Sequence, residues 1–323
     1  MTRALAPELA DLGPVKGELL SNDHTGIVVC GTGSDFADLI GWGNTYRDSL
    51  LTALHIHGAV MLQGFPADLG LFNEFVQVIG GDPLPYTERS TPRSSVSGNI
   101  YTSTEYPPDQ AIPMHNENSY SDVWPDNLYF FCQVAAETGG ATPVADSRAV
   151  CQLIPSAVRD RFAGGVIYAR TFRQGLGLSW QEAFQTEDRS VVEAYCASHH
   201  QQFEWIGDDL RTRHHRPATA HEPFGGEEVW FNQANLFHVS SLEPDLREVL
   251  LSLYGEDFLP RNAYFADGSP ISADDLAAIA AAYDKASFAL PWSAGDIMVV
   301  SNMLAAHGRQ PYTGQRRTLV AMT

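Results

Sequence analysis

The sequence predicts a mainly β fold with flanking helices, built on a double-stranded β-helix core of the jelly-roll or cupin type. The first observation is a change of pattern near residue 99, after which short β-prone runs alternate with turn-forming residues, as in a sandwich or barrel. The second is a pair of polar, histidine-containing segments, 112–120 and 301–309, which follow a turn and an apolar strand respectively. Both segments fit the open end of a jelly roll.

The N-terminal part, about residues 1–98, predicts an α/β flank to this core. Residues 46–57 have the periodicity of an amphipathic helix, 59–62 form a short apolar run typical of a buried strand, and 69–79 predict a second helix. The turn-forming residues 64–66 close the strand.

Further strands and helices are predicted in order along the rest of the chain. The predicted strands are 99–104, 127–134, 165–172, 297–300 and 317–321. A helix over 147–162 interrupts them, and a second helix begins at the capping sequence Ser272-Ala273-Asp274-Asp275 and runs through Tyr283. Helical and loop insertions are therefore expected over about 147–290.

Composition and charge narrow the function classes. The 323 residues include 20 Lys+Arg and 39 Asp+Glu, a formal net charge of −19, which disfavours nucleic acid and anionic membranes as partners. The chain has no apolar run that could span a bilayer and no secretory pattern at its start, so we expect a cytoplasmic protein. No repeat or linker divides the sequence, which predicts one domain over 1–323. The cysteines lack CxxC spacing and are expected to be buried and reduced: Cys30, Cys132, Cys151 and Cys196.

One tripeptide and one distant histidine are the candidate metal ligands. His115 and Glu117 stand two residues apart, so an extended backbone points both side chains to one face. With His307 they would form a set of two histidines and one carboxylate, which is typical of non-haem Fe(II) oxygenases. Eleven histidines and 39 acids give about one His-x-acid tripeptide by chance, so core packing is the alternative interpretation of the pair.

Four motifs in one order make the pattern specific. They are His115-Asn116-Glu117, Gly139-Gly140-Ala141-Thr142-Pro143, His307-Gly308-Arg309 and Gly314-Gln315-Arg316-Arg317. In this order the chain resembles the TauD/TfdA superfamily of Fe(II)- and 2-oxoglutarate-dependent oxygenases, from about Ala59 to the C-terminus. The segments 101–107 and 146–148 are similar to the branch of amino-acid hydroxylases from syringomycin-type peptide pathways.

The resemblance implies roles for individual residues. It implies His115, Glu117 and His307 as iron ligands, and Thr142 and Arg317 as the partners of the distal carboxylate of 2-oxoglutarate. Arg316 is the rival of Arg317, since adjacent strand residues point to opposite faces. We expect Arg317 to enter the barrel because it shares its face with the apolar or small residues Leu319 and Ala321.

Two departures from the family pattern bear on the substrate. The carboxylate ligand is Glu117 where Asp is commoner, and its presence argues against a halogenase, in which this carboxylate is lost. Ala321 stands where the taurine enzyme carries a second arginine, so a simple sulfonate is not the expected substrate.

Other features have a weaker basis. The candidate substrate residues are Arg93, Thr102, Asn118, Asn235 and Ala321. His55 and His57 have chelating spacing, although packing and solvent contact at a helix end are the expected explanation. The basic segment 211–216 either steers an anionic substrate or a phosphopantetheine arm or is a solvated loop, and 230–238 is either a substrate lid or a core strand.

The function implied by the resemblance uses Fe(II), 2-oxoglutarate and O2 and gives succinate and CO2. The expected reaction is hydroxylation of an unactivated C–H bond in an amino acid or amino-acid-derived metabolite of specialised metabolism, free or tethered to a carrier protein. Desaturation, cyclisation and epoxidation by the same cofactor chemistry are alternatives. A zinc hydrolase, a non-enzymatic jelly-roll binding protein and a homo-oligomeric state also stay open at this point.

Overall fold

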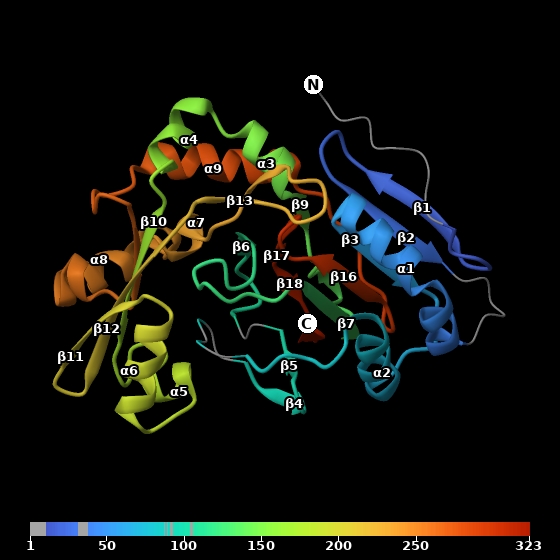
Figure 1. Ribbon diagram of the computed structural model, residues 1–323, viewed down its shortest axis with the longest axis horizontal. Coiled ribbons are helices and arrows are strands. Elements are labelled where there is room, and N and C mark those ends of the chain that lie inside the picture. The colour runs from blue at the N-terminus through green and yellow to red at the C-terminus, as the bar shows by residue number, and fades with distance from the viewer. Residues whose placement is uncertain (1–10, 32–37, 87, 89, 91–92, 104–105) are drawn as a thin grey trace.

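Two β-sheets face each other at the centre of the computed structural model, which describes residues 11–31, 38–86, 88, 90, 93–103 and 106–323 (Figure 1). The larger sheet has eight strands in the order β1 (Lys16–Ser21), β2 (Gly26–Gly31), β3 (Ala59–Gln63), β16 (Ile297–Ser301), β7 (Asn127–Val134), β19 (Arg317–Met322), β5 (Ile100–Thr102) and β4 (Ser95–Ser97). The smaller sheet consists of β6 (Ile112–His115), β17 (Ala305–Arg309) and β9 (Val144–Asp146). This arrangement confirms the predicted jelly-roll class.

Side chains alternate between two cores along the large sheet. On one face Leu319 and Ala321 of β19 join the cluster that packs under the helices α1 (Leu39–His57) and α2 (Leu69–Gly80). On the other face Val320 and Met322 join a cluster that includes Val144 of β9. The second cluster fills the space between the two sheets, which is the interior of the jelly roll.

The N-terminal elements extend the large sheet as well as flank it. β2 pairs with β3 in parallel, and β3 pairs with β16, so the first strands of the chain join the strands near its end. The predicted helix over 46–57 begins earlier, at Leu39, where the Asp38 side chain accepts a hydrogen bond from the Gly41 amide. Non-helical backbone angles at Tyr46 kink this helix, which is why the apolar periodicity is regular only after that point.

The small sheet carries the central pairing of the fold. His307 of β17 lies opposite His115 of β6, and β17 also pairs with β9. A Cβ atom on Gly308 would lie 2.7 Å from the Ile112 carbonyl oxygen. Glycine is therefore needed for β17 to approach β6 closely, as expected from the sequence. The short strands β8 (Thr138–Gly139) and β18 (Tyr312–Thr313) pair beyond this sheet.

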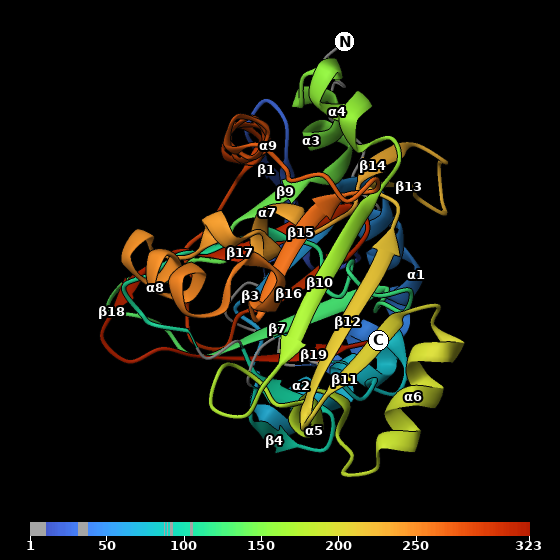
Figure 2. The same ribbon diagram turned by 90° about the vertical axis from the view of Figure 1, so that its left-hand side faces the viewer.

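A third sheet and most of the remaining helices come from the middle of the chain. Its order is β11 (Gln202–Ile206), β12 (Asp209–Arg216), β10 (Val166–Phe172) and β15 (Arg261–Phe265), and Figure 2 shows these strands side by side. The other elements of this region are α3 (Ser147–Leu153), α4 (Ser156–Phe162), α5 (Trp180–Phe184), α6 (Arg189–Ser198), β13 (Thr219–His221), β14 (Glu228–Trp230), α7 (Ala234–Phe237), α8 (Pro244–Tyr254) and α9 (Ala273–Ala286). Met114 of β6 packs in the same core cluster as Tyr168 of β10 and Ala263 of β15. One face of the third sheet is therefore turned toward the strand that carries His115.

Local sequence explains where the predicted elements needed correction. The single helix predicted over 147–162 is two helices, because Pro155 cannot continue the first. Ser272 caps α9 as expected, with its hydroxyl accepting from the Asp275 amide. Part of the predicted strand 99–104 lies outside the described residues, as do Glu105 of the 101–107 motif and the first ten residues.

The cysteines and the helices bear on two expectations about the whole chain. All four cysteines are buried and unpaired, as predicted. Within the described ranges, no helix combines the length and the apolar character that crossing a bilayer requires.

His214 on β12 predicts a pH dependence of stability. Burial, followed by the charge of Arg216, lowers the pKa of His214 to about 4, against the opposing effect of Asp122. The unfolded chain binds a proton at His214 below about pH 6.5, whereas the folded protein does so only near pH 4. The contribution of the neutral imidazole is therefore complete above pH 6.5 and is lost as the pH falls toward 4. We expect the free energy of unfolding to fall by up to about 3 kcal/mol over this interval because of this group.

Urea unfolding at a series of pH values tests this assignment. His214→Gln is expected to flatten the slope between pH 6.5 and 4, whereas His221→Gln, at an exposed position, leaves it unchanged. Equal slopes in wild type and His214→Gln would show that the acid sensitivity arises elsewhere.

Candidate metal centre

Three side chains converge at the junction of β6 and β17. Glu117 lies in the turn that follows β6, and its Oε2 is 4.0 Å from His115 Nε2 and 3.9 Å from His307 Nε2. One ligand atom from each residue lies within 4.8 Å of the others, and all three residues are buried. This is the one such group among the described residues that could hold a metal ion. His55 and His57 are not part of it: His55 stacks on Phe224, with ring centroids 3.4 Å apart.

The protonation chemistry of the group fits a divalent metal. Burial lowers the pKa of both histidines, so the neutral imidazoles that coordinate metals are favoured. The Pro113 carbonyl lies 2.8 Å from His115 Nδ1 and accepts its proton, which leaves Nε2 as the ligand atom. The donor set of two imidazoles and one carboxylate suits Fe(II) with positions left open for other ligands.

Asn302 fixes the turn that carries Glu117, and the sequence analysis assigned no role to it. Its Oδ1 accepts from the Glu117 amide at 2.7 Å, and its Nδ2 donates to the Glu117 carbonyl at 2.9 Å. The same Nδ2 donates to the Pro125 carbonyl, and Asn116 Nδ2 donates to the backbone carbonyl of Asn302. This fully buried amide holds both backbone polar groups of a candidate ligand. In the sequence, the one signal for this role of Asn302 is its position five residues before the candidate ligand His307.

Removing this amide should loosen the metal site. We expect Asn302→Ala to weaken Fe(II) binding by about 10–100-fold, because residues that orient metal ligands typically contribute that much. Anaerobic competition with a metal chelator measures the affinity. Asn22→Ala removes a part-buried amide whose partners are the Ser287 carbonyl and the His24 and Thr25 amides, none of them in this turn, and is the matched control. Equal iron affinity in Asn302→Ala and wild type would contradict the role.

Arg93 joins the candidate ligands through an ion pair. Its Nη2 donates to Glu117 Oε2 at 2.9 Å, and its guanidinium lies over the Tyr86 ring. Among the described residues, its buried Nε and Nη1 atoms have no hydrogen-bond partner. Arg93 therefore offers unused donors to the pocket beside the metal ligands.

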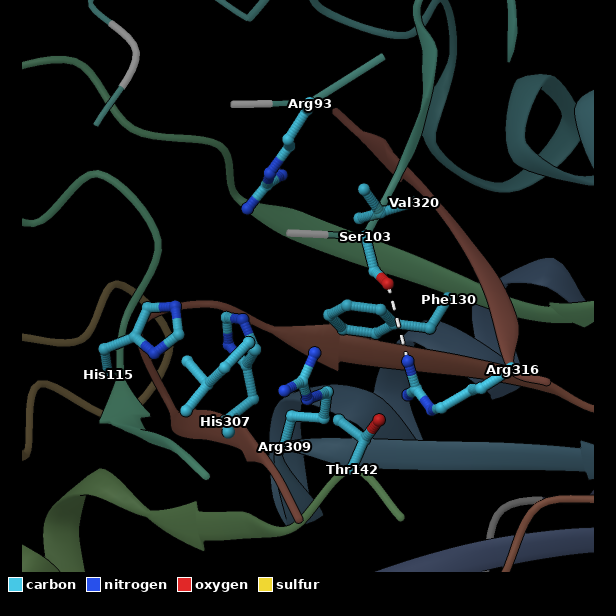
Figure 3. Close-up of a pocket in the computed structure, with 11 residues that line it drawn as sticks. Arg93, Ser103, His115, Phe130, Thr142, His307, Arg309, Arg316 and Val320 are labelled. Carbon is cyan, nitrogen blue, oxygen red and sulfur yellow. Dashed lines mark hydrogen bonds between the residues drawn. The ribbon is translucent and has the colours of Figure 1, made fainter. Parts of the chain in front are cut away.

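A pocket extends from the histidines toward Arg316 (Figure 3). His115 and Arg316 lie toward opposite ends of it, with His307 between them. Its lining residues are Arg93, Ser103, Ile112, His115, Phe130, Thr142, His307, Gly308, Arg309, Arg316 and Val320. Of these, sequence reasoning gave no role to Ser103, Phe130, Arg309 and Val320.

Of the two adjacent arginines, Arg316 and not Arg317 lines this pocket. Arg316 Nε donates to the Gly140 carbonyl at 2.9 Å, and Nη1 lies 3.5 Å from Ser103 Oγ. Burial, followed by the charge of Arg309, lowers the pKa of Arg316 to about 10, so it stays cationic at neutral pH. Arg317 is exposed. The prediction that Arg317 enters the barrel is wrong.

The error has a physical reason that also applies to Ala321. Both faces of β19 are buried, so apolar neighbours did not distinguish the barrel interior from the face under the helices. Ala321 packs in the helix-covered core and does not line the pocket, so the structure gives it no contact with a ligand bound there. Val320 lines the pocket instead, so β19 itself places an apolar side chain there and not a second cation.

Gly140 and Thr142 shape the pocket around Arg316. Gly140 has a φ of +70°, and a Cβ atom there would lie 3.0 Å from Arg316 Cδ, so glycine allows this approach. Thr142 is buried and lines the pocket, and its hydroxyl oxygen accepts from Trp292 Nε1 at 3.1 Å. The hydroxyl proton of Thr142 is therefore available to an anion beside Arg316.

The other candidate substrate residues do not line this pocket. Asn118, in the turn after the ligands, accepts from the Tyr120 hydroxyl. Asn235 donates to the Met114 carbonyl and lines a separate cavity beside β6. Thr102 accepts from the Ser94 amide in the β4–β5 hairpin. Each of the three side chains has a hydrogen-bond partner of its own elsewhere in the fold.

Three further sequence features have structural explanations. The segment 230–238 is mainly core, because Trp230, Phe231 and Phe237 are buried. In the basic segment, Arg211 and Arg213 pair with the acidic residue Asp257. The motif 146–148 is an N-terminal helix cap, in which Asp146 accepts from the Arg148 amide and side chain.

The fold and this group of side chains define a jelly roll with a facial set of two histidines and one carboxylate. Residues 22–323 match the model of the taurine catabolism dioxygenase TauD, TfdA family. The chain is 40% identical over 268 residues to the dapdiamide synthesis protein DdaC of Enterobacter agglomerans, covering 82% of each chain. It is 30% identical over 291 residues to a clavaminate synthase-like protein of Arabidopsis thaliana, covering 86% of this chain and 84% of the other.

Among solved structures, the PvcB protein of Pseudomonas aeruginosa has the same fold, with a TM-score of 0.58 at 15% identity and coverage of 98% of this chain and 93% of PvcB. The chain belongs to the TauD/TfdA family and is an Fe(II)- and 2-oxoglutarate-dependent dioxygenase. A zinc hydrolase and a non-enzymatic binding protein, the other classes considered, do not fit this membership.

Proposed function

We propose that His115, Glu117 and His307 hold the iron and that Arg316 and Thr142 bind the distal carboxylate of 2-oxoglutarate. The observation that carries the proposal is one pocket with the two histidines at one end and a half-buried, cationic guanidinium at the other. A guanidinium fork matches a carboxylate better than any other side chain. The Thr142 hydroxyl adds a neutral donor beside it.

When bound, iron and 2-oxoglutarate supply the coupling of O2 reduction and 2-oxoglutarate decarboxylation to oxidation of a substrate C–H bond. The protein's own contribution is orientation and exclusion of water. Asn302 holds the backbone of Glu117, Arg93 holds its carboxylate, and Phe130 covers His307 with ring centroids 5.2 Å apart. A buried, preorganised site of this kind limits unproductive turnover.

The reaction we propose is hydroxylation of an amino acid or an amino-acid-derived metabolite in specialised metabolism. Two observations support it: similarity to a protein of dapdiamide synthesis, and the buried donors of Arg93 beside the metal ligands. Desaturation, cyclisation or epoxidation would need the same residues, because the outcome depends on the pose of the substrate. A carrier-tethered substrate gains no support from the basic segment, since Asp257 pairs with Arg211 and Arg213.

Anaerobic titration of the metal-free protein with Fe(II), followed by 2-oxoglutarate, tests the assignments. We expect a visible metal-to-ligand charge-transfer band in wild type and none in His115→Ala. A wild-type protein that binds Fe(II) and 2-oxoglutarate without the band, or a His115→Ala protein with the full band, would overturn the proposed ligand set.

A further inference from the structure

Arg261 is a cation for which the proposed catalytic assignments give no role. It is the first residue of β15, and the register places it opposite Arg170 of β10. Two residues along each strand, Tyr168 and Ala263 are also opposite each other, and both lie in the core cluster that contains Met114. Because alternate strand residues share a face, Arg170 and Arg261 are both on the face turned toward β6.

The two arginines differ in how their charges are balanced. Arg170 lies 3.8 Å from Glu88, whose carboxylate also accepts from Gln201 and Tyr195. Within the described part of the chain, the guanidinium of Arg261 has neither a carboxylate partner nor a hydrogen-bond acceptor, and its contact is the Phe237 ring at 5.9 Å. Burial and then the neighbouring charge of Arg170 lower the pKa of Arg261, while Tyr106 raises it.

Arg261 also lies on the metal side of this sheet. The helix α7, which carries Phe237, packs against β6, β10 and β15. The Phe237 ring is 5.0 Å from that of Tyr120, three residues after Glu117. Arg261 therefore lies on the sheet face turned toward β6, and it is not among the residues that line the pocket toward Arg316.

We propose that Arg261 binds a carboxylate of the primary substrate and so selects metabolites that carry a free carboxylate. This proposal rests on the proposed function, since it places the substrate beside the iron ligands. Arg261 is half-buried and lies opposite a second arginine, with no anionic partner among the described residues, which is unfavourable for the ligand-free protein. A carboxylate would both balance the charge and fill the donor fork. The proposed carboxylate site is on β15 and not on β19, whose side chain in the pocket is the apolar Val320.

The first test uses stability without any ligand. A substrate-binding arginine that lacks a protein partner is expected to destabilise the ligand-free fold. Arg261→Met should therefore raise the midpoint of thermal unfolding by about 1–3 °C. Arg170→Met should lower it, because Glu88 would lose its cation, and Arg213→Gln, at an exposed ion pair, should leave it within about 1 °C. A lower midpoint in Arg261→Met would show that the side chain is structural and would overturn the proposal.

The second test uses matched probes. N-acetyl derivatives of the common L-amino acids are compared with their carboxamides as stimulators of succinate formation from 2-oxoglutarate. In wild type we expect stimulation by members with a free carboxylate and little by the amides. Arg261→Met should raise the concentration needed for half-stimulation by at least about 30-fold, and Arg261→Lys should restore part of it. Equal stimulation by acids and amides, or none by any acid, would overturn the carboxylate assignment.

The charge-transfer band separates the two proposals. Arg261→Met should give the band at wild-type Fe(II) and 2-oxoglutarate concentrations, since its side chain contacts neither the candidate ligands nor Arg316. A normal band with unchanged use of the acids would overturn the role of Arg261 alone. Loss of the band in wild type would overturn the proposed function and with it the inference.

Discussion

Replacing Arg316 with alanine should raise the apparent KM for 2-oxoglutarate by about 30-fold or more, while Fe(II) affinity stays near that of wild type. Truncating one partner of a buried, hydrogen-bonded charge pair costs about 2–5 kcal/mol. Arg316 reaches the pocket with Gly140 and Ser103 as its protein partners, and it lies at the end away from His115 (Figure 3). Steady-state succinate formation against 2-oxoglutarate concentration measures the change.

The neighbouring arginine is the matched control. Arg317→Ala removes the same charge one residue away from an exposed position and should change KM by less than about twofold, as is usual for exposed charges. Arg316→Lys should recover only part of the affinity, since an ammonium group lacks the planar fork. A normal KM in Arg316→Ala together with a large rise in Arg317→Ala would reverse the structural assignment.

This pair of arginines shows where sequence reasoning reaches its limit. The family resemblance implied an arginine at the last strand, and a buried dianion is consistent with such a cation. Residue types could not decide between the adjacent Arg316 and Arg317, since Leu319 and Val320 are both apolar and both buried, one against the helices and one in the barrel. Only the position of α1 and α2 over one face of the sheet distinguishes the two.

In the fold and the metal centre as well, local sequence determines single elements, whereas contacts between distant residues depend on the three-dimensional arrangement. Strands with continuous apolar character, such as β7 and β16, were predicted to within one residue because local sequence determines them. The strand pairing of His307 with His115 could only be inferred from a family motif, since 192 residues separate them in sequence (307 − 115). Asn302 and Arg261 could not be assigned, because their roles depend on which backbone groups and charges lie opposite them in space.

Replacing Glu117 with alanine should abolish detectable turnover and also destabilise the metal-free protein. Turnover is lost because the metal site loses its only carboxylate among the described residues. Stability falls because Arg93 is left buried without its carboxylate partner, and breaking a buried ion pair in this way costs about 3–5 kcal/mol. Succinate formation and urea unfolding of the metal-free protein measure the two effects.

A double variant separates these two consequences. Adding Arg93→Met to Glu117→Ala removes the orphaned charge, so much of the lost unfolding free energy should return while turnover stays absent. Glu117→Asp keeps a carboxylate and should retain some iron binding, with the shorter side chain reaching less far toward His115 and His307. If Glu117→Ala alone supported normal hydroxylation, the carboxylate would have no role at the metal. If the double variant were as unstable as the single one, the Arg93–Glu117 pair would contribute little to the fold, and the loss of stability would have to come from packing around the turn that Asn302 holds.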